Sequence, residues 1–293
     1  MKFLITGGTG FIGSNLVNSL IYDRHTVTIL SRSKRKSSRR LVSFKQWDGK
    51  KMPVGIGLYD GVINLAGASL ADARWTDAYK ERIIDSRVNA TRACVKYINA
   101  CQVKPKVFLS GSAIGIYGGL CEEERDETGE LGTDFMARVC QKWEDAAEGA
   151  DCRTVKMRIS VILGKGGALE KMLTPFKLGV GGRLGSGKQP FSWMHIDDLI
   201  KAMRLLLEDE SFEGPINLSS PNWISQQVFA QTLGKALRRP SFMPLPRFML
   251  DLMFGEMGII LWGGQKVVPA KLVDKGFNFQ YPVLMDALKH LTS

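Results

Sequence analysis

The chain opens with Lys2-Phe3-Leu4-Ile5-Thr6-Gly7-Gly8-Thr9-Gly10-Phe11-Ile12-Gly13, the stretch that decides the fold. Its apolar start predicts a buried strand over Lys2–Ile5, and the pattern that follows predicts an amphipathic helix over Phe11–Ile21. Three of the glycines between and within these elements are spaced three residues apart. A strand, a glycine turn and a helix in this order predict the first crossover unit of a parallel sheet.

Each of these three glycines has a physical reason to be small. The first permits a tight turn, the second lets the backbone approach a pyrophosphate, and the third lets helix and strand pack closely. The free N–H groups and the positive dipole end of the helix N-terminus favour phosphate. The alternative is an ordinary glycine turn, but the position between strand and helix favours a dinucleotide site. Its predicted residues are Gly7, Thr9, Gly10, Phe11, Ile12 and Gly13.

The end of the second predicted strand indicates which dinucleotide is bound. In folds that prefer NAD, an acidic residue there binds the ribose hydroxyls. Here Thr26–Leu30 runs into Ser31-Arg32-Ser33-Lys34-Arg35-Lys36, which contains no carboxylate. Ser31 and Arg32 are expected to bond a 2′-phosphate instead, so we predict NADP(H) rather than NAD(H). The outer residues 39 and 40 are interpreted as part of a solvated basic loop.

Composition excludes several classes of protein. The chain has 293 residues, of which 44 % are hydrophobic and 24 % charged, as in ordinary globular proteins, so a disordered chain, a collagen and a small disulfide scaffold are excluded. A formal charge of +11 favours anionic partners. Nucleic acid is the alternative partner for the basic run Arg32–Arg40, but the run lacks interleaved aromatic residues and a second basic patch, so we do not favour it.

The cysteines and apolar runs indicate the compartment. Five cysteines are scattered without a Cys-x-x-Cys pair or metal-ligand spacing, which predicts reduced thiols, no metal site and a cytoplasmic location. The apolar stretch at the N-terminus is too short for a secretory signal. No apolar run approaches the roughly 20 residues that span a bilayer, so no membrane segment is expected.

The rest of the chain alternates short apolar runs with helical patterns, which predicts an α/β fold, a Rossmann-type doubly wound parallel sheet. Further strands are expected at Val62–Leu65, Val107–Leu109, Val155–Ile159 and Ile216–Leu218, and further helices at Asp77–Ala100, Phe135–Glu148 and Ser225–Leu237. The expected Rossmann domain spans residues 1–164, its sheet continued by residues 190–220. A smaller C-terminal substrate lobe is expected from residues 165–189 and 221–293, over the carboxyl ends of the strands.

The tail from Pro240 onward is rich in Met and Pro. We interpret Phe248–Trp262 as a packed helix with its following turn. Its apolar residues are expected to form core against the main lobe: Phe248, Leu250, Met253 and Phe254.

Several motifs resemble those of the extended short-chain dehydrogenase/reductase superfamily. Beside the glycine start, these are Asn64–Gly67, Ser110-Gly111-Ser112 with the following Ile116-Tyr117-Gly118, Arg158–Gly164 and His195–Leu199. The chain is most similar to its atypical branch of SDR39U1-like (YfcH-like) epimerase family proteins. The marks of that branch are Ser86-Arg87, Lys142-Trp143-Glu144, Gly185–Gln189, Trp193–Ile196 and Gly263–Pro269. This resemblance covers nearly the whole chain.

The resemblance implies further cofactor-binding residues, namely Leu65, Ala66, Gly67, Arg87, Ser110 and Ile162. For Arg87 two partners stay open, a phosphate on the nicotinamide side of the cofactor and an anionic substrate. The structural alternative for Arg87 is an ion pair with a neighbouring carboxylate.

The resemblance also implies a serine and a Tyr-x-x-x-Lys pair that moves a proton while the cofactor takes a hydride. None of the six tyrosines has a lysine four residues later. Met136 and Cys140 fall where the pair belongs. Ser112 matches the catalytic serine best, with Ser110 as second choice, and Tyr117 is the candidate acid or base. The alternative is that Tyr117 only lines the pocket, and Cys140 is either a reactive thiol or a packing residue.

Substrate contacts are expected from the glycine-rich entry to the second lobe. Lys188 is the candidate for a substrate phosphate, Trp193 for a stacking face, and His195 has a pKa in the useful range. A histidine before two aspartates is also typical of a structural role, and Asp198 is interpreted as a helix N-cap.

These observations predict an NADP(H)-binding protein that acts as an oxidoreductase or epimerase on a small-molecule hydroxy or keto substrate, such as a nucleotide sugar. The missing Tyr and Lys favour an alternative, a non-catalytic NADP(H) sensor or scaffold. A homodimer through the helices Asp77–Ala100 and Phe135–Glu148 is a further hypothesis.

Overall fold

Seven parallel strands form one central sheet in the computed structural model, which describes residues 1–293. They are β1 (Lys2–Thr6), β2 (Thr26–Ser31), β3 (Val42–Gln46), β4 (Gly61–Asn64), β5 (Val107–Ala113), β7 (Arg153–Ile159) and β11 (Gly214–Leu218). Their order is β11-β7-β5-β4-β1-β2-β3, so the chain winds outward from β1 in both directions. The doubly wound sheet expected from the sequence is confirmed, and its switch point lies between β1 and β4, where such folds bind ligands.

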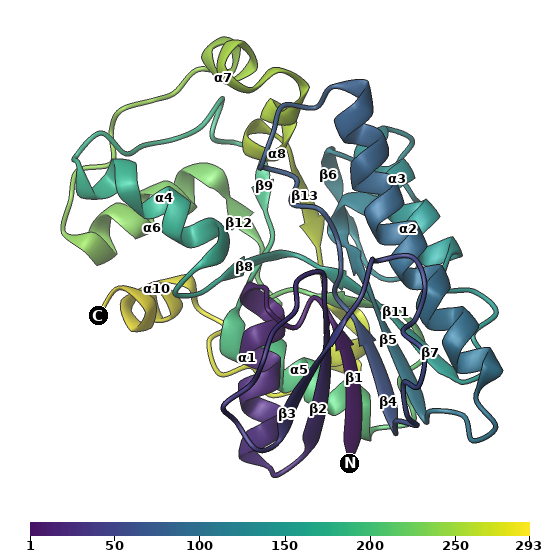
Figure 1. Cartoon of the computed structure of the whole chain (residues 1–293). Coiled ribbons are helices and arrows are strands. Elements are labelled where there is room, and N and C mark those ends of the chain that lie inside the picture. The colour runs from purple at the N-terminus through teal and green to yellow at the C-terminus, as the bar shows by residue number, and fades with distance from the viewer.

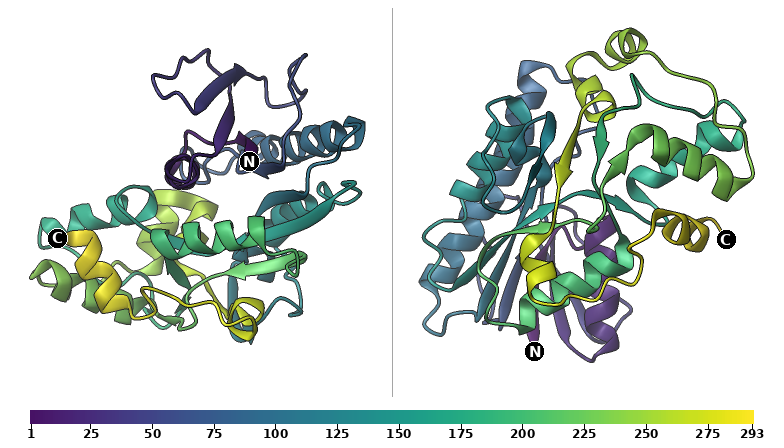
Figure 2. Two further views of the ribbon diagram at one scale, coloured as in Figure 1. Left: turned by 90° about the horizontal axis from the view of Figure 1, so that it is seen from below. Right: turned by 180° about the vertical axis from the view of Figure 1, so that it is seen from behind.

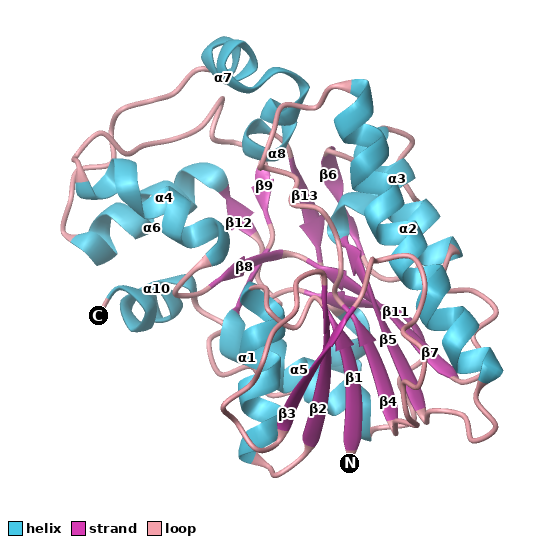
Figure 3. Cartoon of the chain, in the orientation of Figure 1, coloured by secondary structure: helices cyan, strands magenta, loops and turns pink.

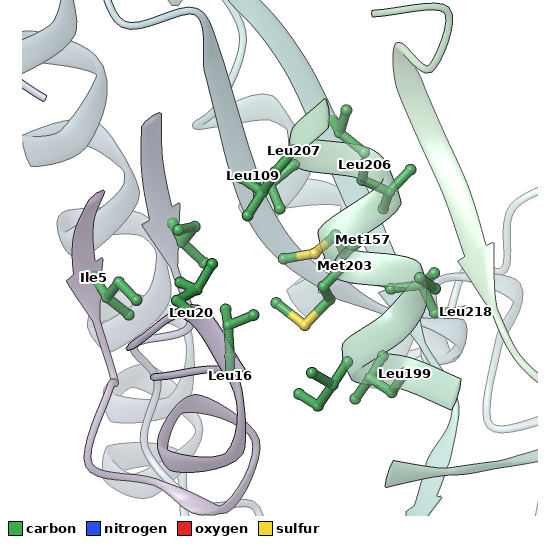
Figure 4. Packing of buried hydrophobic residues seen from close by; sticks show 14 of the residues in the cluster. Ile5, Leu16, Leu20, Leu109, Met157, Leu199, Met203, Leu206, Leu207 and Leu218 are labelled. Atoms are coloured by element: carbon green, nitrogen blue, oxygen red, sulfur yellow. The ribbon is translucent and has the colours of Figure 1, made fainter. Parts of the chain in front are cut away.

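Helices cover both faces of this sheet (Figures 1 and 3). On one face lie α1 (Phe11–Tyr22) and α5 (Ile196–Glu208), and on the other lie α2 (Asp77–Ala100) and α3 (Phe135–Asp145). Figure 4 shows Leu16 and Leu20 of α1 facing Met203 of α5 across the core above the sheet. Helices bury both faces of the central strands, which explains why β1 and β4 are almost continuously apolar.

A second group of elements lies beyond the carboxyl ends of the strands (Figures 1 and 2). It contains the helices α4 (Gly167–Lys177), α6 (Gln226–Leu237), α7 (Arg247–Phe254), α8 (Ile259–Trp262) and α10 (Leu284–Thr292). The short helix α9 (Ala270–Asp274) instead packs against β11, and its Leu272 belongs to the main core. Three strand pairs connect the second group to the main sheet: β8 (Val161–Leu163) with β10 (Trp193–His195), β9 (Pro190–Phe191) with β12 (Ile224–Ser225), and β6 (Leu120–Arg125) with β13 (Gly264–Val267). The residue boundaries of the two expected domains stay a prediction.

Some elements differ from the sequence-based expectation. The edge strand β3 is not predicted, because its polar residues Ser43 and Lys45 alternate with apolar ones on a half-exposed edge. The helix α4 lies inside the stretch 164–187 and is not predicted, because the glycines of this stretch indicate loops. The helix α3 ends at Asp145, three residues early. All five cysteines are free, and no helix is long and apolar enough to cross a bilayer. The cytoplasmic location stays a prediction.

The N-cap of α5 is a correction. Asp198 is not the cap, because His195 Nδ1 accepts the N–H of Asp197 at 3.0 Å. The Asp198 carboxylate instead accepts the N–H groups of Gln280 and Tyr281 at 2.7 and 2.9 Å. Asp198 therefore ties the C-terminal tail to α5.

The tail is a second correction. Leu250 is buried as expected, but Phe248 and Met253 are 70 % and 51 % exposed. The reason is that α7 lies at the rim of the molecule and buries one side only (Figure 1). Its C-terminal carbonyls, of Leu252 and Met253, accept hydrogen bonds from Arg74 in the loop after β4 at 3.2 and 2.9 Å. A cation at a helix C-terminus is favourable, so Arg74 fixes α7 to this loop.

Candidate functional site

The glycine turn after β1 has the shape that its sequence predicts. Gly7 adopts φ +68°, and a Cβ there would lie 2.5 Å from the carbonyl oxygen of Leu65. A Cβ on Gly13 would lie 2.3 Å from the carbonyl oxygen of Gly7, closer than any side chain allows. Gly10 is the N-cap of α1 and offers no side chain to cap it. The N–H groups of the first turn of α1 therefore stay available for a phosphate.

The neighbours of Gly10 divide between solvent and packing. Thr9 is exposed, and Ile12 is half-buried against the core. The ring of Phe11 packs on the glycines that precede and begin α4, because a Cβ on Gly164 or Gly167 would come within 2.5 or 2.8 Å of it. The glycines of this second segment thus let it lie directly on the turn.

The end of β2 carries cations and no acid. Ser31 is the last residue of β2 and is 8 % exposed, whereas Arg32 is exposed and forms no ion pair. Residues 31–40 contain no Asp or Glu. Arg39 donates to the side-chain oxygen of Asn18 in α1 at 2.5 Å, which agrees with a structural role in the basic loop.

The loop after β4 lies against the glycine turn. The Ala66 N–H donates to Thr6 Oγ1 at 3.2 Å and to Asn64 Oδ1 at 3.3 Å, which fixes the loop beside β1. Leu65 and Ala66 are half-buried and Gly67 is exposed. The two loops therefore border the switch point from both sides, as the prediction for these residues requires.

Arg87 of α2 lies directly behind Gly67. A Cβ on Gly67 would be 3.1 Å from Arg87 Cζ, so the guanidinium lies against this backbone. Arg87 is 9 % exposed, and its one hydrogen bond runs from Nη1 to the carbonyl of Ile83 at 2.9 Å. Its Cζ lies 5.0 Å from the centre of the Trp143 ring. Arg87 forms no ion pair, so the alternative of a structural ion pair is wrong, and burial lowers its pKa.

The candidate catalytic residues Ser112 and Tyr117 belong to a buried polar network. Ser112 donates to Glu144 Oε1 at 2.6 Å. Arg158 donates to the same carboxylate from Nε and Nη2 at 2.9 and 3.0 Å, and its Nη1 donates to the Tyr117 hydroxyl at 2.9 Å. All four residues are less than 9 % exposed. This bidentate, charge-assisted geometry is that of a stable structural pair.

The environment of Tyr117 does not support its role as an acid or base. Its hydroxyl is within 2.7 Å of the Asp126 carbonyl and 2.8 Å of Asn217 Oδ1, and it accepts from Arg158. Burial raises the pKa of Tyr117, whereas a tyrosinate base needs a lowered pKa. The geometry favours the alternative that Tyr117 supports the site without moving a proton.

The places of the missing Tyr and Lys hold no proton-transfer group. Met136 is apolar, and its methyl lies 3.1 Å from where a Gly115 Cβ would be. Cys140 is 3 % exposed, and burial raises its pKa to about 12. The thiol is therefore neutral near pH 7, which favours the packing role for Cys140 over the reactive one.

Two further predicted cofactor residues, Ser110 and Ile162, are buried. Ser110 of β5 is 1 % exposed, and its hydroxyl has no hydrogen-bond partner. Ile162 of β8 is 6 % exposed and belongs to the main hydrophobic core. Ile162 is a packing residue, and the contact of both residues with the cofactor stays a prediction.

The predicted substrate residues do not converge on one surface. Lys188 is exposed and its ammonium group is free, as a phosphate contact requires. Trp193 is 1 % exposed within the core of α4, α6 and α10, so it offers no open stacking face. His195 is fully buried, with Nδ1 bound to the Asp197 N–H and Nε2 within 3.2 Å of His290 Nδ1. The structure therefore does not support a substrate role for Trp193 or His195.

His195, Asp197 and His290 bring one potential metal ligand each to within 4.8 Å. Because Nδ1 of His195 already accepts a backbone hydrogen bond, this side chain has one ring nitrogen left, and it faces His290. The expectation of no metal stays a prediction.

Burial lowers the pKa of His195 to about 4, with His290 adding to the effect. Between pH 6.5 and pH 4, His195 is therefore protonated in the unfolded chain and neutral in the folded chain. The free energy of unfolding is therefore expected to fall as the pH drops from 6.5 to 4, by about 3 kcal/mol from this residue. In His195→Asn, which keeps an N-cap acceptor, that slope should be shallower. Urea unfolding from pH 7 to pH 4 measures it, and equal slopes in both proteins would contradict the prediction.

Sequence reasoning missed the partners in the polar network. These partners hold the ends of β5, β7 and β11 together. They are the Arg158–Glu144 pair, the Asn217 side chain and Glu127, whose carboxylate accepts the Asn217 N–H at 3.0 Å. The local sequence gives no signal for this pair. In β7, Arg158 and Lys156 alternate with Val155, Met157 and Ile159, a pattern typical of a strand with one exposed face.

Comparison with known proteins gives the family context. Residues 3–218 match the NAD dependent epimerase/dehydratase family, and residues 245–291 match a domain of unknown function, DUF1731. The chain is 36 % identical to the epimerase family protein YfhF of Bacillus subtilis, over 99 % of this chain and 98 % of that one. It is 38 % identical to the chloroplastic epimerase family protein SDR39U1 homolog of Arabidopsis thaliana, over 99 % and 86 %.

A solved structure agrees with these sequence matches. The crystal structure of human epimerase family protein SDR39U1 with NADPH superimposes with a TM-score of 0.92 and 35 % sequence identity, covering 99 % of each chain. The resemblance to SDR39U1-like proteins that the motifs indicated is confirmed over the whole length. The human relative holds the dinucleotide that the acid-free end of β2 predicts.

Proposed function

Because the chain belongs to the NAD dependent epimerase/dehydratase family, we propose that it binds NADP(H) and acts as an oxidoreductase or epimerase on a small hydroxy or keto substrate, such as a nucleotide sugar. One observation carries the cofactor proposal. The open glycine turn is combined with a β2 end that has a serine, an arginine and no carboxylate. A carboxylate there would repel a 2′-phosphate, whereas Arg32 attracts it.

The residues around the switch point fit such a cofactor. Gly7, Gly10 and Gly13 leave the N-terminus of α1 open to the pyrophosphate, and Ser31 with Arg32 would hold the 2′-phosphate. The loop that contains Leu65, Ala66 and Gly67 would lie along the nicotinamide half. When bound, the nicotinamide supplies hydride transfer.

The chain's own contribution is binding and orientation. The network of Ser112, Glu144 and Arg158 fixes the ends of β5 and β7, and so gives the floor of the site a rigid shape. A proton transferred in the site would come from the substrate or solvent, because the side chains of Met136 and Cys140 cannot supply it.

The side chains of Met136 and Cys140 also favour a second function. A protein with an intact nucleotide site and no acid or base would serve as an NADP(H) sensor or scaffold. Oxidation of bound NADPH in the presence of nucleotide sugars and other carbonyl compounds distinguishes the two functions. Turnover supports the enzyme, and binding without turnover supports the sensor. Pairing of two chains through α2 and α3 stays a prediction that sedimentation would test.

Replacement of Arg32 by Ala tests the cofactor proposal. A charge-assisted hydrogen bond contributes about 1.5–3 kcal/mol, so the dissociation constant of NADPH should rise about ten- to hundredfold. The affinity for NADH, which has no 2′-phosphate, should stay nearly unchanged. Arg39→Ala is the matched control, because Arg39 binds Asn18 and should not affect NADPH. Fluorescence titration measures both nucleotides, and unchanged NADPH affinity in Arg32→Ala would contradict the proposal.

A further inference from the structure

Most of the net positive charge of the chain lies in one short segment. Residues 32–51 hold nine of the 40 Lys and Arg side chains but only one of the 29 Asp and Glu side chains, so this segment carries a surplus of eight out of the total of eleven. Eight of its nine cations are exposed, and none of the nine forms an ion pair. We call the cations of residues 32–40, together with Lys50 and Lys51, the basic edge.

The fold brings the two parts of the basic edge together. The strand β3 is the outermost strand of the sheet and pairs in parallel with β2. Ser31 ends β2, and the Trp47 N–H, just after β3, donates to the Ser31 carbonyl at 2.9 Å. The chain that leads to Lys50 and Lys51 therefore starts beside Arg32. The sequence shows one basic run, and the fold supplies a second basic group next to it.

The basic edge extends over the length of β3. Because β2 and β3 are parallel, residues 32–40 leave the carboxyl end of β2 and return to the start of β3, where the Val27 N–H donates to the Leu41 carbonyl at 2.9 Å. A strand rises about 3.3 Å per residue, so the five residues of β3 span roughly 16 Å. In the left view of Figure 2 this edge, drawn in purple, projects from the rest of the molecule, and no helix covers its outer side.

The 2′-phosphate of NADP(H) needs only a small part of this charge. Ser31 and Arg32, which would hold that phosphate, lie at one end of the edge. The single acid, Asp48, accepts the backbone N–H groups of Lys50 and Lys51 at 2.8 and 2.9 Å, and it pairs with neither ammonium group. Unpaired like charges repel one another, so a concentration of this size is explained when an anion with several charges binds there.

The composition of the surface indicates which kind of polyanion fits. Residues 32–40 are exclusively Ser, Lys and Arg, side chains that contact phosphate oxygens, and none of them is apolar enough to enter a bilayer. Phe44 is half-buried and Trp47 is buried, so neither ring is free to stack on a base. Phosphates follow one strand of a nucleic acid about every 3.4 Å, so an edge of roughly 16 Å matches four or five of them.

We propose that the basic edge binds the phosphodiester backbone of a nucleic acid, independently of its base sequence. Arg32 lies where this surface meets the site for the 2′-phosphate, so a bound strand and NADP(H) share one cation. Each ligand should therefore weaken the binding of the other by the same factor. This coupling rests on the proposed function, whereas binding of the nucleic acid itself does not.

Fluorescence anisotropy with a labelled oligouridylate of 12 nucleotides tests the proposal on the full chain without cofactor. Each phosphate contact to a single strand adds about −0.7 to the slope of log affinity against log salt, so four or five contacts predict a slope near −3. From 50 to 200 mM KCl the affinity should then fall about sixtyfold. An oligoadenylate of the same length should bind within about threefold of the oligouridylate, because backbone contacts carry no sequence information.

Two triple variants with the same change of charge locate the binding surface. The variant on the basic edge should bind the RNA at least about tenfold more weakly, with a slope shallower by about 2. The control variant removes three exposed lysines from α4 and α6 and should bind within about twofold of the parent, because salt screens distant charges. The edge variant is Lys34→Gln, Arg35→Gln and Lys36→Gln, and the control is Lys171→Gln, Lys177→Gln and Lys235→Gln.

The second basic group and the cofactor give independent readouts. Lys50→Gln with Lys51→Gln should weaken RNA binding several-fold and leave the affinity for NADPH unchanged, because both ammonium groups lie outside the 2′-phosphate site. Saturating NADPH should weaken RNA binding to the parent about two- to fivefold, as expected for the loss of one exposed charge pair at Arg32. Unchanged RNA affinity in either measurement would contradict the surface as described.

The remaining outcomes separate this inference from the proposed function. If the parent binds neither RNA at 50 mM KCl, or if both triple variants lose affinity equally, the proposal is overturned. Sedimentation with phosphatidylglycerol vesicles, lost in the edge variant and found without RNA binding, would assign the surface to a membrane and overturn it as well. If RNA binds through the basic edge but NADPH does not bind, the proposed function fails and the nucleic-acid surface stands.

Discussion

Replacing Arg158 with Met is expected to lower the free energy of unfolding by about 3–5 kcal/mol. The substitution leaves the Glu144 carboxylate in the interior, where the residue is only 7 % exposed, and Ser112 is then its one remaining side-chain donor. It also removes a donor from the Tyr117 hydroxyl. A buried charge without its partner is among the costliest changes in a protein interior. Denaturant unfolding, followed by circular dichroism, measures the effect.

The double variant Arg158→Met with Glu144→Leu is the control for this result. It replaces both charges by apolar side chains of similar size, which is often neutral or stabilising. We therefore expect the double variant to recover much of the loss caused by Arg158→Met alone. If the single variant is as stable as the parent, the network is not the structural unit described above. If the double variant is the less stable of the two, the interaction depends on more than this pair.

Replacing Gly13 with Ala is expected to abolish NADPH binding and to lower the free energy of unfolding by about 1–3 kcal/mol. The added methyl would lie 2.3 Å from the Gly7 carbonyl oxygen and 2.7 Å from the Gly8 Cα. Both neighbours are backbone atoms, so the turn must open. An opened turn no longer aims the N–H groups of α1 at one point, which a pyrophosphate requires.

Gly57→Ala is the matched control for this change. Gly57 has ordinary backbone angles and nothing within 4 Å of an added Cβ. This variant should bind NADPH as the parent does and should unfold at the same or a slightly higher temperature. A Gly13→Ala protein that binds NADPH with parental affinity would contradict the role of the turn.

The sequence predicts most of the central fold because its signals are local. The strands β1, β2 and β4 are short apolar runs, and α2 begins and ends at the expected residues because Thr76 caps it and its apolar spacing is regular. The strand β3 escapes prediction because an edge strand is half polar. The exposed side of α7 also escapes, since a helix of Phe, Met and Leu gives no local sign of which face stays uncovered.

The candidate site is predicted in part for the same reason. The glycine turn and the basic end of β2 are contiguous in sequence, so their shape can be expected from the residues alone. The pairing of Arg158 with Glu144 joins β7 to α3, and the lack of an acid near Arg87 depends on α2, α3 and β4 together. Such relations arise only from packing. The Cys140 thiol, whose pKa burial raises, is another property that position in the sequence does not reveal.

The most direct test of this account is a comparison of NADPH and NADH binding to the unmodified protein, by fluorescence titration at one ionic strength. We predict that NADPH binds at least about tenfold more tightly, because one extra charge-assisted phosphate contact contributes 1.4 kcal/mol or more. Equal affinities, a preference for NADH or no binding of either nucleotide would contradict it.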